Sequence, residues 1–191
     1  MNNDINQLNE VDKFILLLLK ANNEKPVPGA LWLQKELFLL QNIFPRLADE
    51  TDFDSYFLGP YSEVVNDEEE ELHKSNLIQI NGDKRSLTTK GRNIVEEILK
   101  KTDKKEIDKI EQFKGLLNDL TKDELLALIY FTSPITDEIR KESIVYRDLS
   151  HKRKNIAVSL YKKGKVSAQR ASQIAGIDLE DFLKLIKSVT E

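Results

Sequence analysis

The dipeptide Asn81-Gly82 limits the fold of this chain more than any other feature of its sequence. It separates two short segments of extended character, residues 77–80 and 84–87. Asn-Gly is the strongest short-range signal for a β-hairpin, because both turn positions require a positive φ. Segments with helical periodicity lie on both sides of it. The sequence therefore predicts one small hairpin in an otherwise helical region.

The order of the elements around this hairpin points to one architecture. Apolar residues recur at helical spacing over 7–22, which Asn22-Asn23 ends, and over 30–44, which Pro45 stops. The aromatic segment 53–58 is predicted to be extended, and Ser62 is placed to cap a helix over 63–75. Thr88 or Thr89 begins a helix after the hairpin, with an apolar stripe at Ile94, Val95, Ile98 and Leu99. This is the order of a winged helix-turn-helix domain with a C-terminal helix.

The second half of the chain is predicted to be helical throughout. We expect a charged connecting helix over 100–112, a helix that begins at the capping box Thr121 to Glu124 and ends at Ser133-Pro134, and another over 136–148. Three short helices follow, over 151–163, over 168–175 after Ser167, and around Phe182, Leu183 and Ile186. Two helices joined by Gly176-Ile177-Asp178 form a helix-turn-helix.

These elements together predict a mainly α fold. A winged helix-turn-helix with one small β-hairpin comes first, then connecting helices, then a C-terminal three-helix helix-turn-helix module. The predicted divisions are a winged-helix domain at 1–100, a helical connector at 101–150 and a basic module at 151–191.

Composition narrows the classes of protein further. The chain has no cysteine, which excludes disulfides, thiolate metal sites and cysteine nucleophiles. Its longest apolar run, 14–19, is six residues, whereas a membrane span needs about 20. The first ten residues lack the basic and apolar regions of a signal peptide. We expect a cytoplasmic protein with no membrane partner.

The charge of the chain is distributed unevenly. The formal net charge is -4, but residues 1–100 carry 11 basic and 18 acidic side chains, and residues 151–191 carry 9 basic and 4 acidic ones. The stretch 151–170 has seven basic residues and no acid: Lys152, Arg153, Lys154, Lys162, Lys163, Lys165 and Arg170. Such a step suggests a module boundary near residue 150, although a solvated helix face would have the same composition.

The sequence favours a protein that is not an enzyme. The two histidines, His73 and His151, are not spaced as metal ligands, and the seven glycines form no phosphate-binding loop. The acidic run 67–71 spreads around its helix, so that only pairs such as Asp67 and Glu71 share a face. We expect no catalytic residues, no metal and no cofactor.

Residues 31–91 resemble the winged-helix domains of prokaryotic YwgA-like and Panacea-type proteins, the latter including antitoxins and proteolytic adaptors. The resemblance rests on Leu33-Gln34-Lys35, on the segment 56–62 with its Gly59-Pro60-Tyr61-Ser62, and on Leu87-Thr88-Thr89-Lys90-Gly91. One departure is the acidic run 67–71, where such domains place an apolar residue between Val65 and Leu72.

Residues 152–186 resemble a small prokaryotic family of helix-turn-helix proteins often assigned as antitoxins. The matching residues are Ala157, Leu160-Tyr161, Gly164-Lys165-Val166-Ser167, Ala171, Ile174-Ala175-Gly176-Ile177 and Phe182-Leu183.

Both helix-turn-helix segments place acids where DNA bases would be read. The helix 63–75 carries the run 67–71, and the last helix begins Asp178-Leu179-Glu180-Asp181. Such carboxylates oppose a surface with one phosphate charge per about 1.7 Å. The wing residues Lys84 and Arg85 could still contact a phosphate, or be simply exposed.

DNA remains the first partner that we expect, through phosphate contacts from the seven basic residues of 151–170 and polar contacts from Gln169 and Gln173. The protein would then be a DNA-binding regulator, of a transcriptional or toxin-antitoxin type, and by analogy with other helix-turn-helix proteins a homodimer. The alternative is an antitoxin-like or adaptor-like protein that binds another protein. Its interface would include Tyr56, Tyr61, Glu68 and Glu69, although Tyr56 and Phe57 could also belong to the core. The basic segment could also bind an acidic protein, or the acidic N-terminal module itself.

Overall fold

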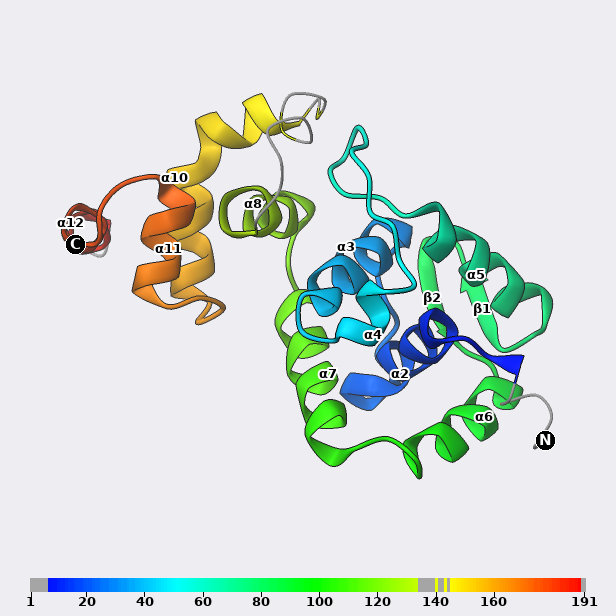
Figure 1. Cartoon of the computed structure of the whole chain (residues 1–191). Helices are drawn as coiled ribbons and strands as arrows, with labels where there is room; N and C mark the ends of the chain where they lie inside the picture. Colours follow the sequence, from blue (N-terminus) through cyan, green and yellow to red (C-terminus); the bar gives the residue numbers. More distant parts are fainter. Residues whose placement is uncertain (1–6, 134–139, 141–142, 144, 190–191) are drawn as a thin grey trace. The chain divides into compact units, whose positions relative to one another are not determined.

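The computed structural model describes residues 7–133, 140, 143 and 145–189 of the chain. These residues fold into two compact units, which are described separately (Figure 1). Unit 1 comprises the chain up to Asp54 together with Pro60–Asp119. Unit 2 comprises the short segment Ser55–Gly59 and the chain from Leu120 onward. The fold is mainly α with a single two-stranded hairpin among the described residues, as predicted.

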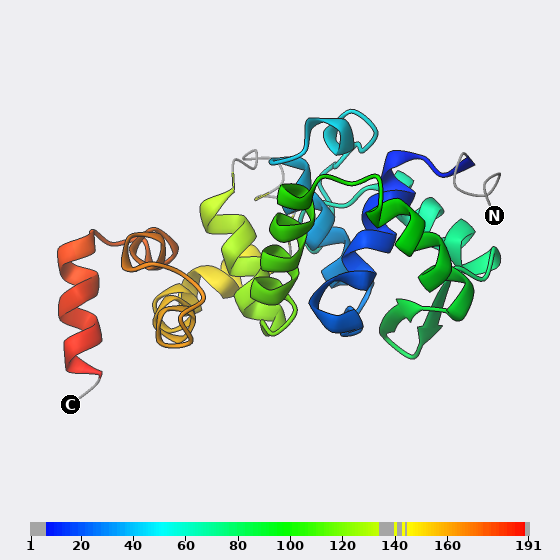
Figure 2. The ribbon, with the colours of Figure 1, turned by 90° about the horizontal axis from the view of Figure 1, so that it is seen from below.

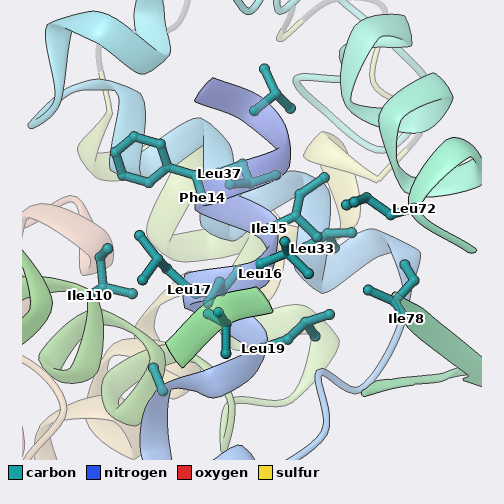
Figure 3. Packing of buried hydrophobic residues seen from close by; sticks show 14 of the residues in the cluster. Phe14, Ile15, Leu16, Leu17, Leu19, Leu33, Leu37, Leu72, Ile78 and Ile110 are labelled. Carbon is teal, nitrogen blue, oxygen red and sulfur yellow. The ribbon is translucent and has the colours of Figure 1, made fainter. Parts of the chain in front are cut away.

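The centre of unit 1 is helix α2 (Glu10–Glu24), which was predicted to be amphipathic and whose middle is buried all round, while Lys13 and Lys20 stay partly exposed. All six residues from Phe14 to Leu19 are buried. Figure 3 shows Phe14 to Leu17 and Leu19 among Leu33 and Leu37 of α3 (Ala30–Gln41), Leu72, Ile78 and Ile110. A helix that is apolar all round belongs inside a core rather than on its surface. The run 14–19 is therefore the axis around which unit 1 is built.

Helix α2 ends as predicted at Asn22-Asn23, although its last turn is unusual. Asn22, Asn23 and Glu24 all have a left-handed backbone, with φ between 53° and 58°. Such a conformation is uncommon outside glycine, and asparagine is among the residues that tolerate it best. The second predicted helix is shorter than expected: α3 stops at Gln41, and Pro45 begins the short helix α4 (Pro45–Ala48) instead of ending α3. Proline suits a first helical turn because its missing N–H would have no partner there.

The hairpin is confirmed, with its turn one residue later than Asn81-Gly82 implies. Strands β1 (Ile78–Asn81) and β2 (Lys84–Leu87) pair antiparallel, and Asn81 pairs with Lys84. The turn residues are therefore Gly82 and Asp83, and of these only Gly82 has a positive φ. Val27 forms a bridge with Arg85. This isolated bridge lies outside the two-stranded sheet and ties the segment before α3 to β2.

Two helices flank this hairpin as predicted. Helix α5 (Glu63–Lys74) is capped by Ser62, whose Oγ accepts a hydrogen bond from Val65 N. Helix α6 (Thr89–Leu99) is capped by Thr88 in the same way. Gly91, from the Leu-Thr-Thr-Lys-Gly sequence, lies so close to β1 that a Cβ there would be 1.9 Å from the Leu77 carbonyl oxygen. That close approach is the physical reason for glycine at this position.

Two of the sequence elements behind the winged-helix resemblance bind each other. Gln34 donates to the Ser62 carbonyl oxygen and accepts from Ser62 N, both at 3.0 Å. The Lys35 ammonium donates to the Pro60 carbonyl oxygen at 2.5 Å. The segment 53–58 is not a strand, and its only pairing is the bridge between Asp54 and Tyr61. Helix α3 therefore fixes the Pro60–Ser62 turn that precedes α5.

Helix α7 (Lys104–Leu117) closes unit 1 and lies along α2. It was predicted over 100–112, and its actual start is set by the Asp103 side chain, which caps it. Because unit 1 continues to Asp119, the contacts group α7 with the winged helix. The three-part division into 1–100, 101–150 and 151–191 stays a prediction about separable domains.

Unit 2 is built from helices α8 (Lys122–Thr132), α10 (Tyr146–Lys162), α11 (Ala168–Ala175) and α12 (Leu179–Ser188). The predicted capping box of α8 is confirmed, with Thr121 and Glu124 each accepting from the other's backbone N–H. Ser167 caps α11, and Gly176 ends it in the left-handed conformation. The helix predicted over 136–148 lies largely outside the described residues. The predicted helix-turn-helix of α11 and α12 is therefore present, and α10 precedes it as the first helix of the three-helix module.

Candidate functional site

Two of the seven basic residues of 151–170 hold unit 2 together. The Arg153 guanidinium donates to the carbonyl oxygens of Ile174 at 2.6 Å and Gln173 at 2.9 Å, at the C-terminal end of α11. It also lies 4.2 Å from the centre of the Phe131 ring. These contacts join α10 to α11 and α8. A Cβ on Gly176 would be 2.5 Å from the Arg153 Cζ, so the guanidinium also explains that glycine.

Lys163 is the second structural cation. Its ammonium contacts both carboxylate oxygens of Glu124, at 2.6 and 2.9 Å, and Ser159 donates to the same carboxylate. The Glu124 side chain is almost fully buried. Burial alone would raise the pKa of Glu124, but the hydrogen bonds from Lys163, Thr121 and Ser159 bring it below its usual value. Lys163 therefore neutralises a buried acid between α8 and α10.

The remaining basic side chains of this stretch face outward or form only surface contacts. Lys154, Lys162 and Arg170 are exposed, and Lys165 is half-buried. Lys162 donates to the Val189 carbonyl oxygen and Arg170 to the Gln173 side chain, both at 3.2 Å. Lys152 pairs with Asp148 at 2.6 Å and with Asp123 at 3.4 Å, and it is about half exposed. Exposed pairs of this kind contribute little free energy, so their cations can exchange partners.

The two predicted polar contacts lie on this surface. Gln169 and Gln173 are both exposed on α11. The following helix α12 exposes Asp178, Glu180 and Asp181 in and before its first turn. Asp178 caps the helix by accepting from Asp181 N. The first turn of the reading helix is where a helix-turn-helix contacts bases, so these carboxylates disfavour base contacts by α12.

In unit 1 the acidic helix α5 turns part of its charge inward. Glu69 is buried and pairs with Arg85 Nε at 2.6 Å, with only 8% and 12% of the two side chains exposed. Glu68 accepts from Asn9 Nδ2 at 2.7 Å and is half-buried. Both residues were predicted as parts of a protein interface, whereas their carboxylates are used inside unit 1. Asp67, Glu70 and Glu71 remain exposed.

Glu68 also approaches Asp12 of α2. Burial, together with the charge of the neighbouring Glu68 carboxylate, raises the pKa of Asp12 from 3.8 to about 7. Asp12 accepts from Asn9 N as part of the cap of α2. The Glu68 carboxylate therefore lies beside an aspartic acid whose raised pKa favours its protonated form.

The wing offers one outward cation rather than two. Lys84 is exposed at the start of β2. Arg85 is bound to Glu69 and also donates to the Asp83 carbonyl oxygen at 2.6 Å. A single exposed lysine at a hairpin tip gives the wing little electrostatic attraction for a phosphate backbone.

The aromatic segment before the turn splits between surface and interior. Tyr56 is 50% and Phe57 is 58% exposed, and their ring centres lie 5.1 Å apart. The core alternative for these two residues is therefore wrong. Tyr61 is half-buried, and its backbone forms the bridge with Asp54. Gly59 has a φ of 85°, and a Cβ there would be 2.9 Å from the Tyr130 hydroxyl oxygen, so the segment packs tightly on α8.

Three further buried ionisable groups of unit 1 were not predicted from the sequence. Glu36 is fully buried, which raises its pKa to about 8, and Lys114 opposes that shift. Burial lowers the pKa of Lys114 to about 8 and that of Lys35 to about 7. The Lys114 ammonium donates to the carbonyl oxygens of Ala21 and Leu19, where α2 ends. Its role there is to satisfy backbone groups that the left-handed turn leaves without helical partners.

Two open hollows lie on unit 1, beside the end of α2 and beside its start. The first, about 390 Å³, is lined by Leu17, Lys20, Glu24, Glu111 and neighbouring apolar residues. Lys20 pairs there with Glu24 and Glu96. The second contains Arg46, which is paired with Glu10 and Glu106. Lys20 and Arg46 thus find their counter-charges within the chain.

Two kinds of feature are absent from the residues that the structure describes. No group of three or more His, Asp or Glu side chains there is arranged to hold a metal ion. None of the helices in the same part of the chain is both long and apolar enough to cross a bilayer.

Comparison with known proteins places the C-terminal part of the chain. Residues 133–189 match the model of an uncharacterised protein family (UPF0175), a segment that contains α10, α11 and α12. The match confirms that the C-terminal segment resembles a small protein family. Searches of curated proteins and of solved structures return no match.

Proposed function

We propose that this protein is a non-enzymatic regulator that binds double-stranded DNA through the sugar-phosphate backbone, using the outer surface of α10 and α11. The observation that carries the proposal is the exposure of Lys154, Lys162 and Arg170 within a stretch of twenty residues that contains no acid. Arg153 and Lys163 are bound to groups of unit 2 itself and are not phosphate ligands in the proposal.

Phosphate contact fits this surface better than base reading. Lysine and arginine on flanking helices bind phosphates and set the position of a protein on DNA without recognising its sequence. The exposed acids at the start of α12 would oppose entry of that helix into a groove. Gln169 and Gln173 on α11 provide uncharged hydrogen-bonding groups beside the cations. We therefore propose binding with low sequence preference, by a cytoplasmic protein that acts as a homodimer.

The test is the salt dependence of binding to a labelled DNA duplex, measured by fluorescence anisotropy. Each phosphate contact contributes a slope of about -0.9 to the plot of log K against log salt concentration. The K154A variant should reduce the magnitude of the slope by about 1, and K154A/K162A/R170A by about 3. K101A, an exposed lysine of unit 1, is the matched control and should leave the slope unchanged. No binding at low salt, or an equal loss in the control, would refute the proposal.

A second candidate function rests on Tyr56 and Phe57. Two adjacent exposed aromatic rings are unusual on a protein surface, and aromatic residues are enriched at the centres of protein interfaces. The resemblances to antitoxins and adaptors also favour a protein-binding function. In this proposal the pair binds another protein, which the tagged full chain should recover stoichiometrically from nuclease-treated lysate. The Y56S/F57S variant should lose that partner, while K154A should retain it.

A further inference from the structure

Helix α12 buries only part of its apolar surface. Among its residues only Phe182 is buried, where its ring meets Tyr161 edge-on at 5.7 Å. Leu183 is 41% exposed, and Leu179, Leu185 and Ile186 are half-buried. Figures 1 and 2 both show α12 at the edge of unit 2, with α10 and α11 on one side of it. The apolar strip formed by Leu179, Leu183 and Ile186 is therefore only partly covered by its own unit, and Leu183 is its exposed edge.

Charged residues border this strip in a fixed order. Glu180, Leu183 and Lys187 are spaced i, i+3 and i+7, so they lie in one row along the helix. The row begins with an acid near the N-terminus and ends with a base near the C-terminus. Leu179 and Ile186 lie beside Leu183 on the same side. The exposed side of α12 is thus apolar in the middle and of opposite charge at its two ends.

We infer that α12 binds the α12 of a second copy of this chain, in antiparallel orientation, around a two-fold axis close to Leu183. In that arrangement Leu183 meets its counterpart, and Glu180 of each copy lies opposite Lys187 of the other. A two-fold axis makes every contact occur twice, as closed homodimers require. The antiparallel direction also brings the positive N-terminal end of each helix dipole beside the negative C-terminal end of its partner.

The charges of α12 favour a second copy of the chain, rather than DNA, as its binding partner. A DNA surface would oppose Glu180 and its acidic neighbours, whereas a second copy supplies a lysine to each Glu180. The pairing specifies the interface of the homodimer, but it does not require DNA binding, which the proposed function assigns to α10 and α11. A single pair of ten-residue helices is a small interface. Interfaces of that size form weak complexes, so the dimer should dissociate on dilution.

The pairing can be tested by reversing charges and measuring the mass of the full chain by sedimentation velocity over a range of concentrations. The wild type should change from monomer to dimer as its concentration rises. E180K and K187E each place like charges opposite one another, so each alone should need at least tenfold higher concentration to dimerise. An equimolar mixture of the two restores both opposite-charge pairs and should dimerise about as well as the wild type.

The matched control is D181K. Asp181 and Glu180 both pair with Lys184 in the same helix, so both substitutions remove a contact of that lysine. Asp181 lies on the opposite side of α12 from Leu183, so D181K should dimerise like the wild type. Far-UV circular dichroism checks that each variant keeps its helices. A wild type that stays monomeric at high concentration would overturn the inference, as would a mixture no better than either variant alone. Loss of DNA binding with dimerisation intact would overturn only the proposed function.

Discussion

Helices α5 and α12 occupy equivalent positions in their respective helix-turn-helix units. Both carry acidic residues at positions where a DNA-binding helix would contact DNA. They use these acids in different ways. In α5, Glu69 is buried against Arg85 and Glu68 is bound to Asn9. In α12, Glu180 and Asp181 stay exposed and pair only with Lys184 of the same helix. An acidic helix can therefore be part of the packing of a unit or part of its outer surface.

The number of neighbouring elements explains this difference. Helix α5 packs against both α2 and β1, so that any residue on its inner side must find a partner in the interior. A buried carboxylate without a partner would be too costly, and Arg85, Asn9 and Asp12 supply the partners. Helix α12 packs mainly on α11 and buries one ring. Its charges stay in water, and they remain available to other molecules.

The largest expected effect is in unit 1. E69A leaves the Arg85 guanidinium mostly buried without its counter-charge, and breaking a buried pair in this way costs about 3–5 kcal/mol of unfolding free energy. Chemical denaturation followed by Trp32 fluorescence measures it, because Trp32 is the only tryptophan and lies in unit 1.

Two exposed glutamates serve as controls for E69A. Glu70 lies beside Glu69 on α5, and Glu180 occupies the comparable helix of unit 2. E70A and E180A should each change the free energy of unfolding by less than about 0.5 kcal/mol, as is usual for surface substitutions. Similar losses for E69A and E70A would mean that α5 does not bury its charge selectively.

An intermediate effect is expected in unit 2 from Arg153, which was predicted from the sequence to contact a DNA phosphate. R153A removes two charged hydrogen bonds to the end of α11 and a contact with the Phe131 ring. Because part of the side chain is exposed, we expect a loss of about 2–3 kcal/mol. The measurement is thermal unfolding followed by far-UV circular dichroism. K154A, the adjacent exposed lysine, should unfold like the wild type, and a stable R153A protein with weaker DNA binding would reverse the two assigned roles.

The smallest effect concerns pH. The pKa of Asp12 is about 7 in the folded protein, whereas the usual value for an aspartic acid is 3.8. Folding therefore favours the protonated acid. This contribution to stability is greatest at low pH and is lost as the pH rises toward 7, by at most about 1.4 kcal/mol per pH unit. D12N cannot ionise at this position. Its free energy of unfolding, relative to that of the wild type, should therefore increase by about 1 kcal/mol from pH 6 to pH 7. Denaturation curves at both pH values measure it, and a constant difference would contradict the role assigned to the Glu68 carboxylate.

Features that depend on neighbouring residues in the sequence were predictable. Ser62, Thr88, Thr121 and Ser167 cap the helices that they were expected to cap, because a cap needs only a side chain and the N–H two or three residues later. The hairpin was predicted for the same reason. Its turn shifted by one residue because the pairing of Ile78 with Leu87 sets the register, and that pairing depends on which side chains face the core.

Features that depend on distant residues were not predictable. Nothing around Glu69 in the sequence indicates that Arg85 lies beside it, and nothing near Arg153 indicates the end of α11. A count of the seven basic residues in 151–170 therefore does not distinguish the two structural cations, Arg153 and Lys163, from the exposed ones. The apolar run 14–19 shows the reverse limit, because periodicity alone cannot distinguish a helix with one buried face from one buried all round.

The position of Glu124 has a consequence for how the C-terminal module could be exchanged between proteins. The family match begins at residue 133, whereas the carboxylate that neutralises Lys163 and the ring that receives Arg153 lie in α8, before that point. A gene fusion joined at residue 133 would transplant both cations without their counterparts. A recipient would have to provide its own acid and its own aromatic ring in equivalent places. The recombination joint that keeps this module whole therefore lies upstream, before the cap of α8 at Thr121.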